Sequence, residues 1–393
     1  MINKNKDRGI TLVALVITII ILLILATISI QSLTNTGLFQ KAQEAKEKTQ
    51  NAEENQAKTL NEYEDELNKY TSGTPTTPPA PQVKKVADNI GSVLSTTDNT
   101  ELQDAYGNKI VVPAGFKIVS DSTTNNAQTV NQGIVIEDAT KTAEGTATAT
   151  AGSQFVWIPV GKIYTDTAKT DANAKTIELG RYSFDSNGNK SAYSGSYVEE
   201  DANDESTLTN TENKAIAKNI TNFKNSVAAN GGYYIGRYEA RTTTERTSSE
   251  NPLTQITEKG TDSVYNYVTQ KQAAEQAQNM YNSNKFTSDL MNSYAWDTAT
   301  LFLQTCGKEK YSRKTSVNSL LASKGTNASD YTGTRDTVCN VYEWTTETSN
   351  DSRSPCVSRG GVYVNSNRYT SYRYGGTTSY SYDLVGFRPL LFV

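Results

Sequence analysis

The sequence predicts an α+β fold class in which a long N-terminal helix leads, through a proline-rich linker, to a β-rich head. Three observations carry this prediction. Residues 10–30 are an unbroken apolar run, residues 71–82 contain four prolines, and beyond residue 83 short β-branched and aromatic runs alternate with turn residues. The chain of 393 residues has room for one large or two ordinary domains after the apolar run.

The composition excludes several classes of function. The net charge of −4 leaves no basic footprint, so no nucleic-acid partner is expected. The absence of histidine removes His-based acid–base catalysis, His-dependent triads and His metal sites. Three cysteines, Cys306, Cys339 and Cys356, are too few for a disulfide framework. One pair can form in an oxidising exterior, and the sequence leaves open which one.

The first predicted element is a membrane-spanning helix, Ile10–Ile30. It carries no charged side chain and has no polar face. A rise of about 1.5 Å per residue makes it about 30 Å long, the thickness of the hydrocarbon core of a bilayer. Basic residues precede it, so the positive-inside rule places the N-terminus in the cytoplasm and the head outside. A buried helix of a globular core is the alternative.

A short basic leader, residues 1–9, ends in Gly9 directly before the apolar run. This arrangement resembles a type IV prepilin leader, which implies cleavage by a prepilin peptidase after Gly9 and methylation of the new terminus at Ile10. The resemblance also implies other pilins as partners and a location at the cell surface or in a pilus. Ala14 departs from the family, which has Glu there to pair with a neighbouring terminus. An uncleaved membrane anchor is the alternative.

The membrane helix is predicted to continue as a stalk to residue 70. The stretch Leu38–Tyr70 is rich in Ala, Glu, Lys and Gln, with Glu44–Lys48 and Glu54–Lys58 as favourable i,i+4 pairs. A coiled-coil spacer would need a stronger apolar stripe. Residues 71–82 then form an exposed Pro/Thr-rich linker.

The head is predicted as a small β-rich connecting region, residues 83–150, followed by a domain at residues 151–393. Strands are expected at residues 109–112, 116–119, 133–137, 155–160 and 231–239, and helices at residues 268–282 and 288–303. The polar stretch 166–230 is expected to form surface loops.

Several short motifs in this head occur in the order of a known domain. They include YYIGRYEA at residue 233, NVYEW at 340–344, RGG at 359–361 and GFR at 386–388. The order resembles the formylglycine-generating-enzyme/sulfatase-modifying domain, which implies a C-type-lectin-like fold. The resemblance implies structural anchors, with the arginines contacting carboxylates such as Glu343 or backbone carbonyls: Trp344, Arg359, Gly360, Gly361, Gly386, Phe387 and Arg388.

The same resemblance argues against enzymatic activity. The formylglycine-generating branch needs two cysteines at positions that correspond to Asn365 and Thr370, and the related sulfoxide-forming branch needs iron-binding histidines. Neither set is present, so the chain is not expected to be an enzyme or to need a catalytic cofactor. The implied fold often carries structural calcium, but no short acidic cluster identifies a metal site.

A tyrosine-rich segment, residues 362–383, lies between the RGG and GFR motifs. It contains six tyrosines among Ser, Asn, Thr, Gly and Arg, a composition that antibody paratopes also use because tyrosine gives contact area at low entropic cost. Every residue type in it has a codon ending in C, which resembles the variable region of a diversity-generating retroelement target. The predicted ligand-binding residues are Tyr363, Asn365, Asn367, Tyr369, Tyr372, Arg373, Tyr374, Tyr380 and Tyr382.

The sequence therefore predicts a surface-displayed protein that binds an unknown protein or glycan ligand through a tyrosine-rich face on a pilin-like membrane anchor. One alternative is a minor pilin or pseudopilin that acts in assembly or adhesion. The other is an enzyme of the sulfatase-modifying class with altered chemistry. A polar, tyrosine-rich hairpin without a binding role is the simplest competing interpretation of residues 362–383.

Overall fold

The computed structural model describes most of the head and isolated residues before it. The described residues are 19–21, 46, 49, 60, 63, 83–119, 129–200, 217–250, 256, 257, 259, 262–306, 310–313, 341–362 and 368–393. The chain divides into two compact units, Met1–Gln82 and Val83–Val393. The predicted leader, its cleavage site at Gly9 and Ile10, and the linker at residues 71–82 lie outside the described residues.

The predicted fold class and membrane location are corrected here. The described part of the chain is mostly β-sheet with few helices, and none of its helices is long and apolar enough to cross a membrane. A spanning helix needs about 20 consecutive apolar residues. Most of Ile10–Ile30 lies outside the described residues, which hold only Ile19, Ile20 and Ile21 of it. The pilin-like transmembrane helix and the single-pass location at a membrane, cell surface or pilus are therefore not retained.

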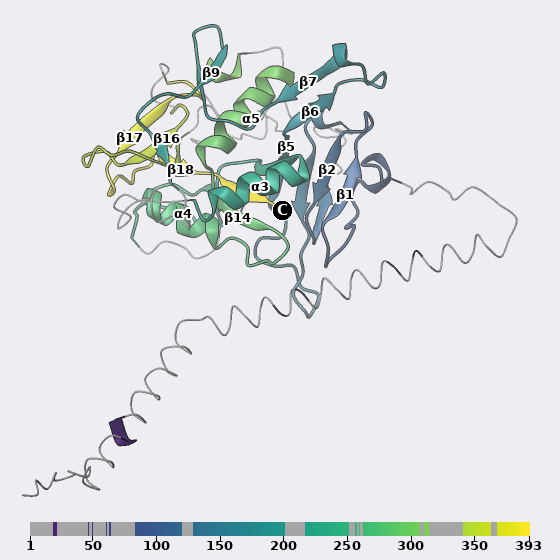
Figure 1. Ribbon diagram of the computed structural model, residues 1–393. Helices are drawn as coiled ribbons and strands as arrows, with labels where there is room; N and C mark the ends of the chain where they lie inside the picture. The colour runs from purple at the N-terminus through teal and green to yellow at the C-terminus, as the bar shows by residue number, and fades with distance from the viewer. Residues whose placement is uncertain are drawn as a thin grey trace, which may run out of the picture. The chain divides into compact units, whose positions relative to one another are not determined.

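A six-stranded antiparallel sheet forms the centre of the head (Figure 1). Its strands, in spatial order, are β14 (Thr287–Leu290), β19 (Pro389–Phe392), β11 (Gly232–Gly236), β5 (Gln154–Pro159), β4 (Val135–Asp138) and β3 (Phe116–Ile118). Strands β3 and β4 come from the predicted connecting region, so residues on both sides of position 150 share one sheet. All residues of β11 and β19 are buried, as expected for strands at the centre of a sheet.

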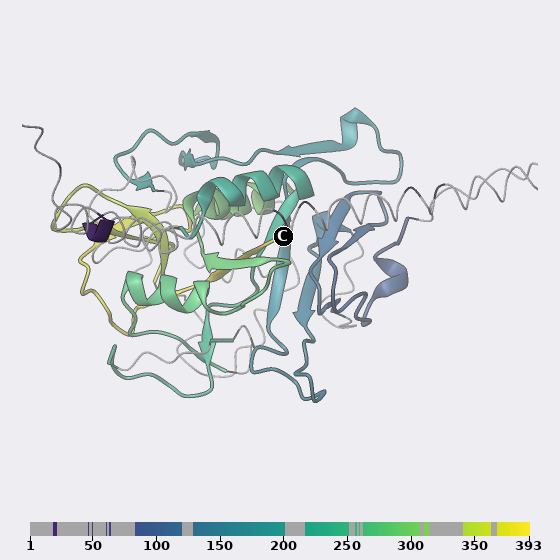
Figure 2. The same cartoon turned by 60° about the horizontal axis from the view of Figure 1, so that its bottom comes forward.

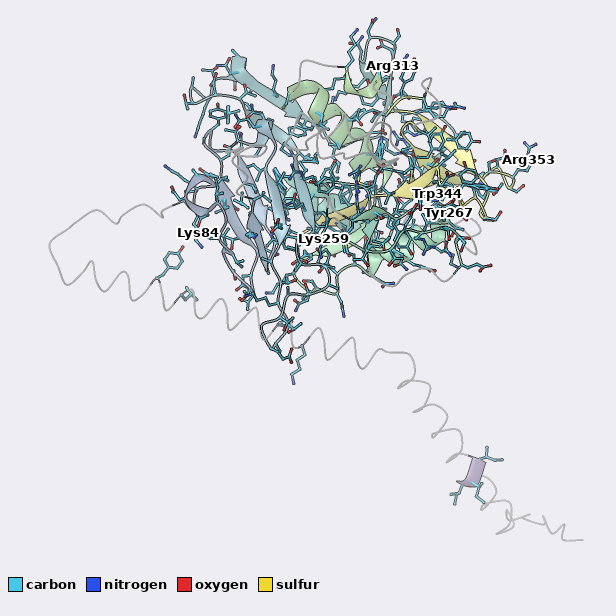
Figure 3. All side chains as sticks on the ribbon, turned by 180° about the vertical axis from the view of Figure 1, so that it is seen from behind. Lys84, Lys259, Tyr267, Arg313, Trp344 and Arg353 are labelled. Carbon is cyan, nitrogen blue, oxygen red and sulfur yellow. The ribbon has the colours of Figure 1, made fainter. Side chains whose placement is uncertain are left out.

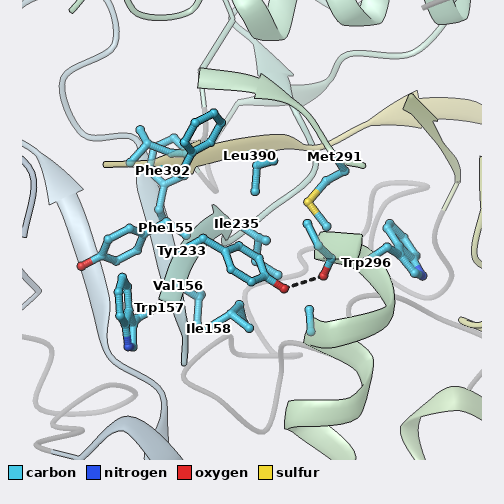
Figure 4. Packing of buried hydrophobic residues seen from close by; sticks show 14 of the residues in the cluster. Phe155, Val156, Trp157, Ile158, Tyr233, Ile235, Met291, Trp296, Leu390 and Phe392 are labelled. Atoms are coloured by element: carbon cyan, nitrogen blue, oxygen red, sulfur yellow. Dashed lines mark hydrogen bonds between the residues drawn. The ribbon is translucent and has the colours of Figure 1, made fainter. Parts of the chain in front are cut away.

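Three α-helices are described around this sheet: α3 (Ile220–Asn230), α4 (Gln270–Gln278) and α5 (Ser293–Cys306) (Figure 2). Helix α3 packs on β11 and β19, while α4 packs on β14. The core between them is aromatic, and Figure 4 shows Tyr233 of β11 directed at the first turns of α5, where its hydroxyl donates to the Ala295 carbonyl at 2.6 Å. A buried tyrosine needs such a partner.

A second sheet carries the C-terminal motifs. Strand β15 (Tyr342–Thr348) lies at its centre, between β10 (Val198–Glu199) and β16 (Cys356–Arg359). Strand β17 (Arg373–Gly376) extends the sheet beyond β16, and β18 (Val385–Phe387) pairs with β15 in parallel. Two chain segments about 150 residues apart thus meet at β10 and β15, with Glu199 directly opposite Glu347.

Four two-stranded sheets and four short 3-10 helices complete the described elements. The sheets are β1 (Thr100–Gln103) with β2 (Lys109–Val112), β6 (Gly161–Tyr164) with β7 (Ala174–Ile177), β8 (Tyr182–Phe184) with β9 (Lys190–Ala192), and β12 (Arg241–Thr242) with β13 (Ser263–Val264). The 3-10 helices are η1 (Ala87–Asn89), η2 (Val130–Gln132), η3 (Asp171–Asn173) and η4 (Tyr311–Arg313). Residues 166–230, expected as loops, therefore hold β7 to β10 and α3.

Candidate functional site

The C-terminal motifs form the rigid support of the candidate site. The Trp344 side chain is fully buried, and its indole N–H donates to the Val268 carbonyl at 2.8 Å. Arg388 forms a two-pronged pair with Glu343, with N···O distances of 2.9 and 3.1 Å, and also donates to the Gly236 carbonyl. This pair ties β15 to β11, so the arginine links the two sheets. Figure 3 shows Trp344 within the C-terminal part of the head.

The glycines of these motifs allow close packing. Gly360 has a φ of +86°, a conformation that favours glycine. A Cβ atom at Gly386 would lie 3.0 Å from a Val341 methyl and 3.3 Å from the Tyr265 carbonyl. Gly361 and Phe387 are buried beside them. Every one of the seven predicted anchors is thus buried in the described structure.

A buried ion network lies beneath the tyrosine-rich segment. Arg359 contacts Asp297 at 2.5 Å and Glu347 at 3.2 Å. Arg373 reaches the same two carboxylates at 2.5 and 2.8 Å, and Arg181 pairs with Glu347 at 2.6 Å. Three guanidinium groups therefore share two carboxylates supplied by α5 and β15. Paired, hydrogen-bonded geometry of this kind is what allows charges to be buried.

The charges of this network shift the pKa values of Glu347 and Arg373 in opposite directions. Burial acts to raise the pKa of Glu347, but the guanidinium groups of Arg359, Arg373 and Arg181 outweigh it, and the pKa is lowered. Burial acts to lower the pKa of Arg373, and the charges of Asp297 and Glu347 reverse this and raise it. Both shifts favour the charged form, so Glu347 and Arg373 stabilise each other as an ion pair.

A continuous strip of aromatic side chains lies over this network. Arg368 contacts the rings of Tyr372 and Tyr374 at 4.2 and 5.7 Å from their centroids, and Tyr374 stacks on Tyr342 at 5.5 Å. At one end, Tyr380 meets Trp344 edge-on at 5.9 Å and Tyr382 at 5.0 Å. We call this strip the tyrosine face; its members are Tyr193, Tyr197, Tyr342, Arg368, Tyr369, Tyr372, Tyr374, Tyr380 and Tyr382.

The other end of the tyrosine face comes from residues 193–197. The Tyr193 ring lies between two guanidinium groups, with Arg373 at 3.9 Å and Arg181 at 4.7 Å from its centroid. Its hydroxyl accepts a hydrogen bond from the Tyr197 backbone N–H at 3.3 Å. Burial raises the pKa of Tyr197. Arg181 and Arg373 of the ion network thus hold this end of the face through their contacts with Tyr193.

The predicted ligand-binding residues divide into four groups. Tyr363, Asn365 and Asn367 lie outside the described residues. Tyr382 is 56% exposed, and Tyr369 and Tyr372 are partly exposed. Tyr374 and Tyr380 pack against other aromatic rings and present only part of their surface.

Arg373 is the fourth case, because it lies deeper than the tyrosines with which it was predicted to bind a ligand. Its side chain is only 8% exposed, and both ends of its guanidinium group are paired with buried carboxylates. Because β17 alternates its sides, Arg373 points inward at the position where the sequence predicts display. Arg373 belongs to the support of the tyrosine face and not to its surface.

Sequence reasoning missed the residues that come from far away in the chain. Tyr193, Tyr197 and Arg181 lie in the stretch expected to be surface loops, and Asp297 lies inside α5 with 0% exposure. A charged residue within the apolar sequence of α5 was the available signal, because a buried carboxylate requires a partner. For Tyr193 and Tyr197 no local pattern distinguishes them from the other tyrosines of the chain.

The chemistry available at the tyrosine face is that of binding. Phenol rings and one guanidinium group offer apolar area, cation–π contacts and hydrogen bonds. Among the described residues, no group of three or more acidic or cysteine side chains is placed to hold a metal ion. Comparison of the chain with protein-family models, characterised proteins and solved structures gives no match, so the site is interpreted from its own geometry.

Proposed function

We propose that this protein is a ligand-binding protein whose tyrosine face contacts a macromolecular ligand. The proposal rests on one observation: the buried ion network that supports the tyrosine face is separate from the exposed tyrosines of that face. Arg359, Arg373 and their carboxylates are buried and paired, whereas Tyr369, Tyr372 and Tyr382 lie outside them and make no ion pair. A binding surface needs a rigid base and side chains that lose little entropy on binding, and tyrosine meets the second need.

Arg368 favours an acidic or polar group on the ligand. Its guanidinium lies over the Tyr372 and Tyr374 rings, and within the described part of the chain no carboxylate forms a salt bridge with it. Tyr and Arg are the residue types most enriched among the dominant contacts of protein interfaces. The centre of the face therefore combines aromatic area with one positive charge.

The proposal extends to diversification of this face. On the resemblance to targets of diversity-generating retroelements, residues 362–383 would vary between copies of the gene while the C-type-lectin-like frame stays constant. In this view the chain is a binding protein and not an enzyme. The ion network supports the idea, because substitutions at Tyr369, Tyr372 or Tyr382 leave its five charged groups intact.

Sequencing of the gene from a population of the source strain tests diversification. We expect substitutions to concentrate at the tyrosine and asparagine codons of residues 363–382. The codons of Trp344, Arg359 and Arg388 should be constant, and Arg373 should be constant too. Substitutions spread evenly across the head, or frequent at Arg373, would contradict the proposal.

An array of purified proteins and glycans tests binding itself. The full chain should bind at least one array member, and the double variant Tyr372→Ala/Tyr382→Ala should lose that signal. Lys84→Ala is the matched control, because Lys84 is exposed and Figure 3 places it far from Trp344. Equal binding by the double variant and the control would exclude the tyrosine face as the binding surface.

A further inference from the structure

A polar cleft, lined by residues on both sides of β5 in the sequence, shares no residue with the tyrosine face. Its volume is about 750 Å³, within the range of about 300–1,000 Å³ that small-molecule sites have. One wall comes from the hairpin that joins β4 and β5, with Thr140, Thr148 and Thr150. The facing wall is the segment between α4 and β14, residues 280–286. Figure 3 shows Lys259, which donates to the hairpin carbonyl of Ala149, well apart from Arg353.

The threonines of the hairpin form a chain of hydroxyl groups that ends on a buried carboxylate. Asp138 is 1% exposed, and its Oδ1 accepts from the Thr140 backbone N–H at 2.8 Å and the Thr140 hydroxyl at 2.6 Å. Its Oδ2 accepts from the Tyr281 hydroxyl at 3.0 Å. The Thr140 and Thr148 hydroxyl oxygens are 2.7 Å apart, and those of Thr148 and Thr150 are 3.3 Å apart.

The carboxylate fixes the direction of the hydrogen bonds nearest to it. A hydroxyl has one hydrogen and two lone pairs, and a carboxylate can only accept. Since Thr140 gives its hydrogen to Asp138, its hydroxyl oxygen can only accept from Thr148, whose hydroxyl also lies 3.4 Å from the Thr140 carbonyl oxygen. The Thr140 hydroxyl then has no hydrogen left for a ligand, and the Thr148 hydrogen is directed at Thr140. At these two residues the threonine wall therefore offers hydrogen-bond acceptors to a ligand.

The remaining lining favours uncharged ligands. Lys285 is the one charged side chain of the lining, and its ammonium is already paired with Asp98 at 3.1 Å. With that pair made, the lining presents no unpaired charge to attract an anion or a cation. Phe286, Met280 and the Tyr281 ring add an apolar surface beside the hydroxyl groups. Neutral groups with many O–H donors and a C–H face match this combination.

We propose that this cleft binds a neutral polyhydroxylated ring, the chemistry of a saccharide unit. The ring hydroxyls donate to Thr140, Thr148 and Thr150, while the exposed side chains of Asn282 and Asn284 on the facing wall offer both donors and acceptors. The C–H face of the ring packs against the apolar side of the cleft. This proposal is independent of the tyrosine face, because the two sites have no residue in common.

Saturation-transfer NMR with the full chain tests the proposal. The probes are the methyl glycosides of glucose, galactose and mannose, with sorbitol as an open-chain polyol, glucuronate as an anion and glucosamine as a cation. We expect at least one neutral glycoside to bind in the millimolar range and to exceed all three comparison compounds. Tighter binding of sorbitol, glucuronate or glucosamine, or no binding by any glycoside at tens of millimolar, would overturn the proposal.

Three variants connect that signal to the cleft. Thr148→Val removes the central hydroxyl at nearly constant shape, so affinity should fall about three- to tenfold, the loss of one hydrogen bond. Asn284→Ala changes an exposed side chain, so it keeps the test valid even where Thr148→Val fails to fold. Thr146→Val is the control, since Thr146 lies exposed on the same hairpin outside the cleft. Unchanged affinity in both Thr148→Val and Asn284→Ala would also overturn the proposal.

Discussion

At the scale of single residues, Arg373 shows how strongly the stability of the head can depend on one buried, paired charge. Its guanidinium contacts Asp297 and Glu347 and covers the Tyr193 ring. Removing the Arg373 side chain leaves these two buried carboxylates with fewer partners. The effect of such a loss exceeds that of any single hydrogen bond, because an uncompensated buried charge remains.

We therefore expect Arg373→Ala to lower the free energy of unfolding by about 3–5 kcal/mol. Urea denaturation followed by tryptophan fluorescence measures this. Arg353→Ala is the matched control: its side chain is 88% exposed and pairs only with Asp351, so its effect should stay within about 0.5 kcal/mol. Equal effects of the two variants would mean that the ion network does not stabilise the head.

Glu199 is a buried residue whose charge depends on pH near neutrality. Burial and the facing charge of Glu347 raise the pKa of Glu199 to about 7, against hydrogen bonds from Ser293 and Thr346. Because the folded-state pKa is raised from 4.5, its contribution to stability is complete below about pH 4.5 and is lost as the pH rises through 7. The ionised form is therefore the destabilised one.

Glu199→Gln should remove this dependence on pH. Relative to the variant, the wild-type protein should lose up to about 3 kcal/mol of unfolding free energy between pH 5 and pH 8. Denaturation at several pH values measures the difference, in which Asp289 and other titrating groups cancel. A difference that is constant with pH would show that Glu199 has an ordinary pKa in the folded protein.

At this scale the sequence predicts which motif residues are buried better than it predicts the side of a strand on which a side chain lies. The motifs at 344, 359–361 and 386–388 identify residues that are all buried. Glu343 was a candidate partner for the arginines, and it pairs with Arg388, whereas Arg359 pairs with Asp297 and Glu347. Composition placed Arg373 with its tyrosine neighbours, because the side on which a strand residue lies depends on its pairing register.

At the scale of elements, α3 is a helix that the sequence analysis does not predict, because the stretch around it is polar. It buries only the narrow stripe of Ile220, Phe223, Ser226 and Val227, within a stretch expected to be loop. The residues at its two ends, however, are typical helix caps. Asn219 caps the first turn by accepting from the Asn222 N–H at 2.6 Å, and Gly231 ends the helix in the left-handed conformation at φ +74°.

Asn219→Ala should lower the free energy of unfolding by about 0.5–2 kcal/mol, because the capping acceptor is lost. Asn225→Ala, on the exposed side of the same helix, should be neutral or slightly stabilising, since alanine has the higher helix propensity. Thermal unfolding by circular dichroism compares the two. Similar losses in both variants would mean that the cap contributes nothing.

Element types are predictable where local signals agree, and less so elsewhere. Lys109–Val112 is a strand with the expected bounds, and the buried strand β5 differs from expectation by one residue at each end. The helix expected at residues 288–303 begins later, because residues 287–290 pair with β19 as strand β14. Such pairing with a segment about 100 residues further on overrides local propensity, and no window of sequence contains it.

At the scale of the molecule, the core cluster of the head, as far as the described residues show it, consists of residues from Val86 onward. The unit Val83–Val393 should therefore fold without the preceding residues. We expect a fragment of these residues to melt within a few degrees of the full chain, measured by calorimetry at equal protein concentration. A fragment that shows no cooperative transition would mean that residues 1–82 contribute to the core.

The position of β19 has a consequence for how the chain is made. Residues 389–392 lie between β11 and β14, and the Asn230 side chain of α3 donates to the Val393 carbonyl at 3.0 Å. While a ribosome is still adding residues before position 389, β11 and β14 have an empty slot between them and expose two unpaired edges. Such edges invite pairing with other chains. Closure of the central sheet has to wait until residues 389–392 have emerged, so these two edges stay open to other chains while most of the head is being made.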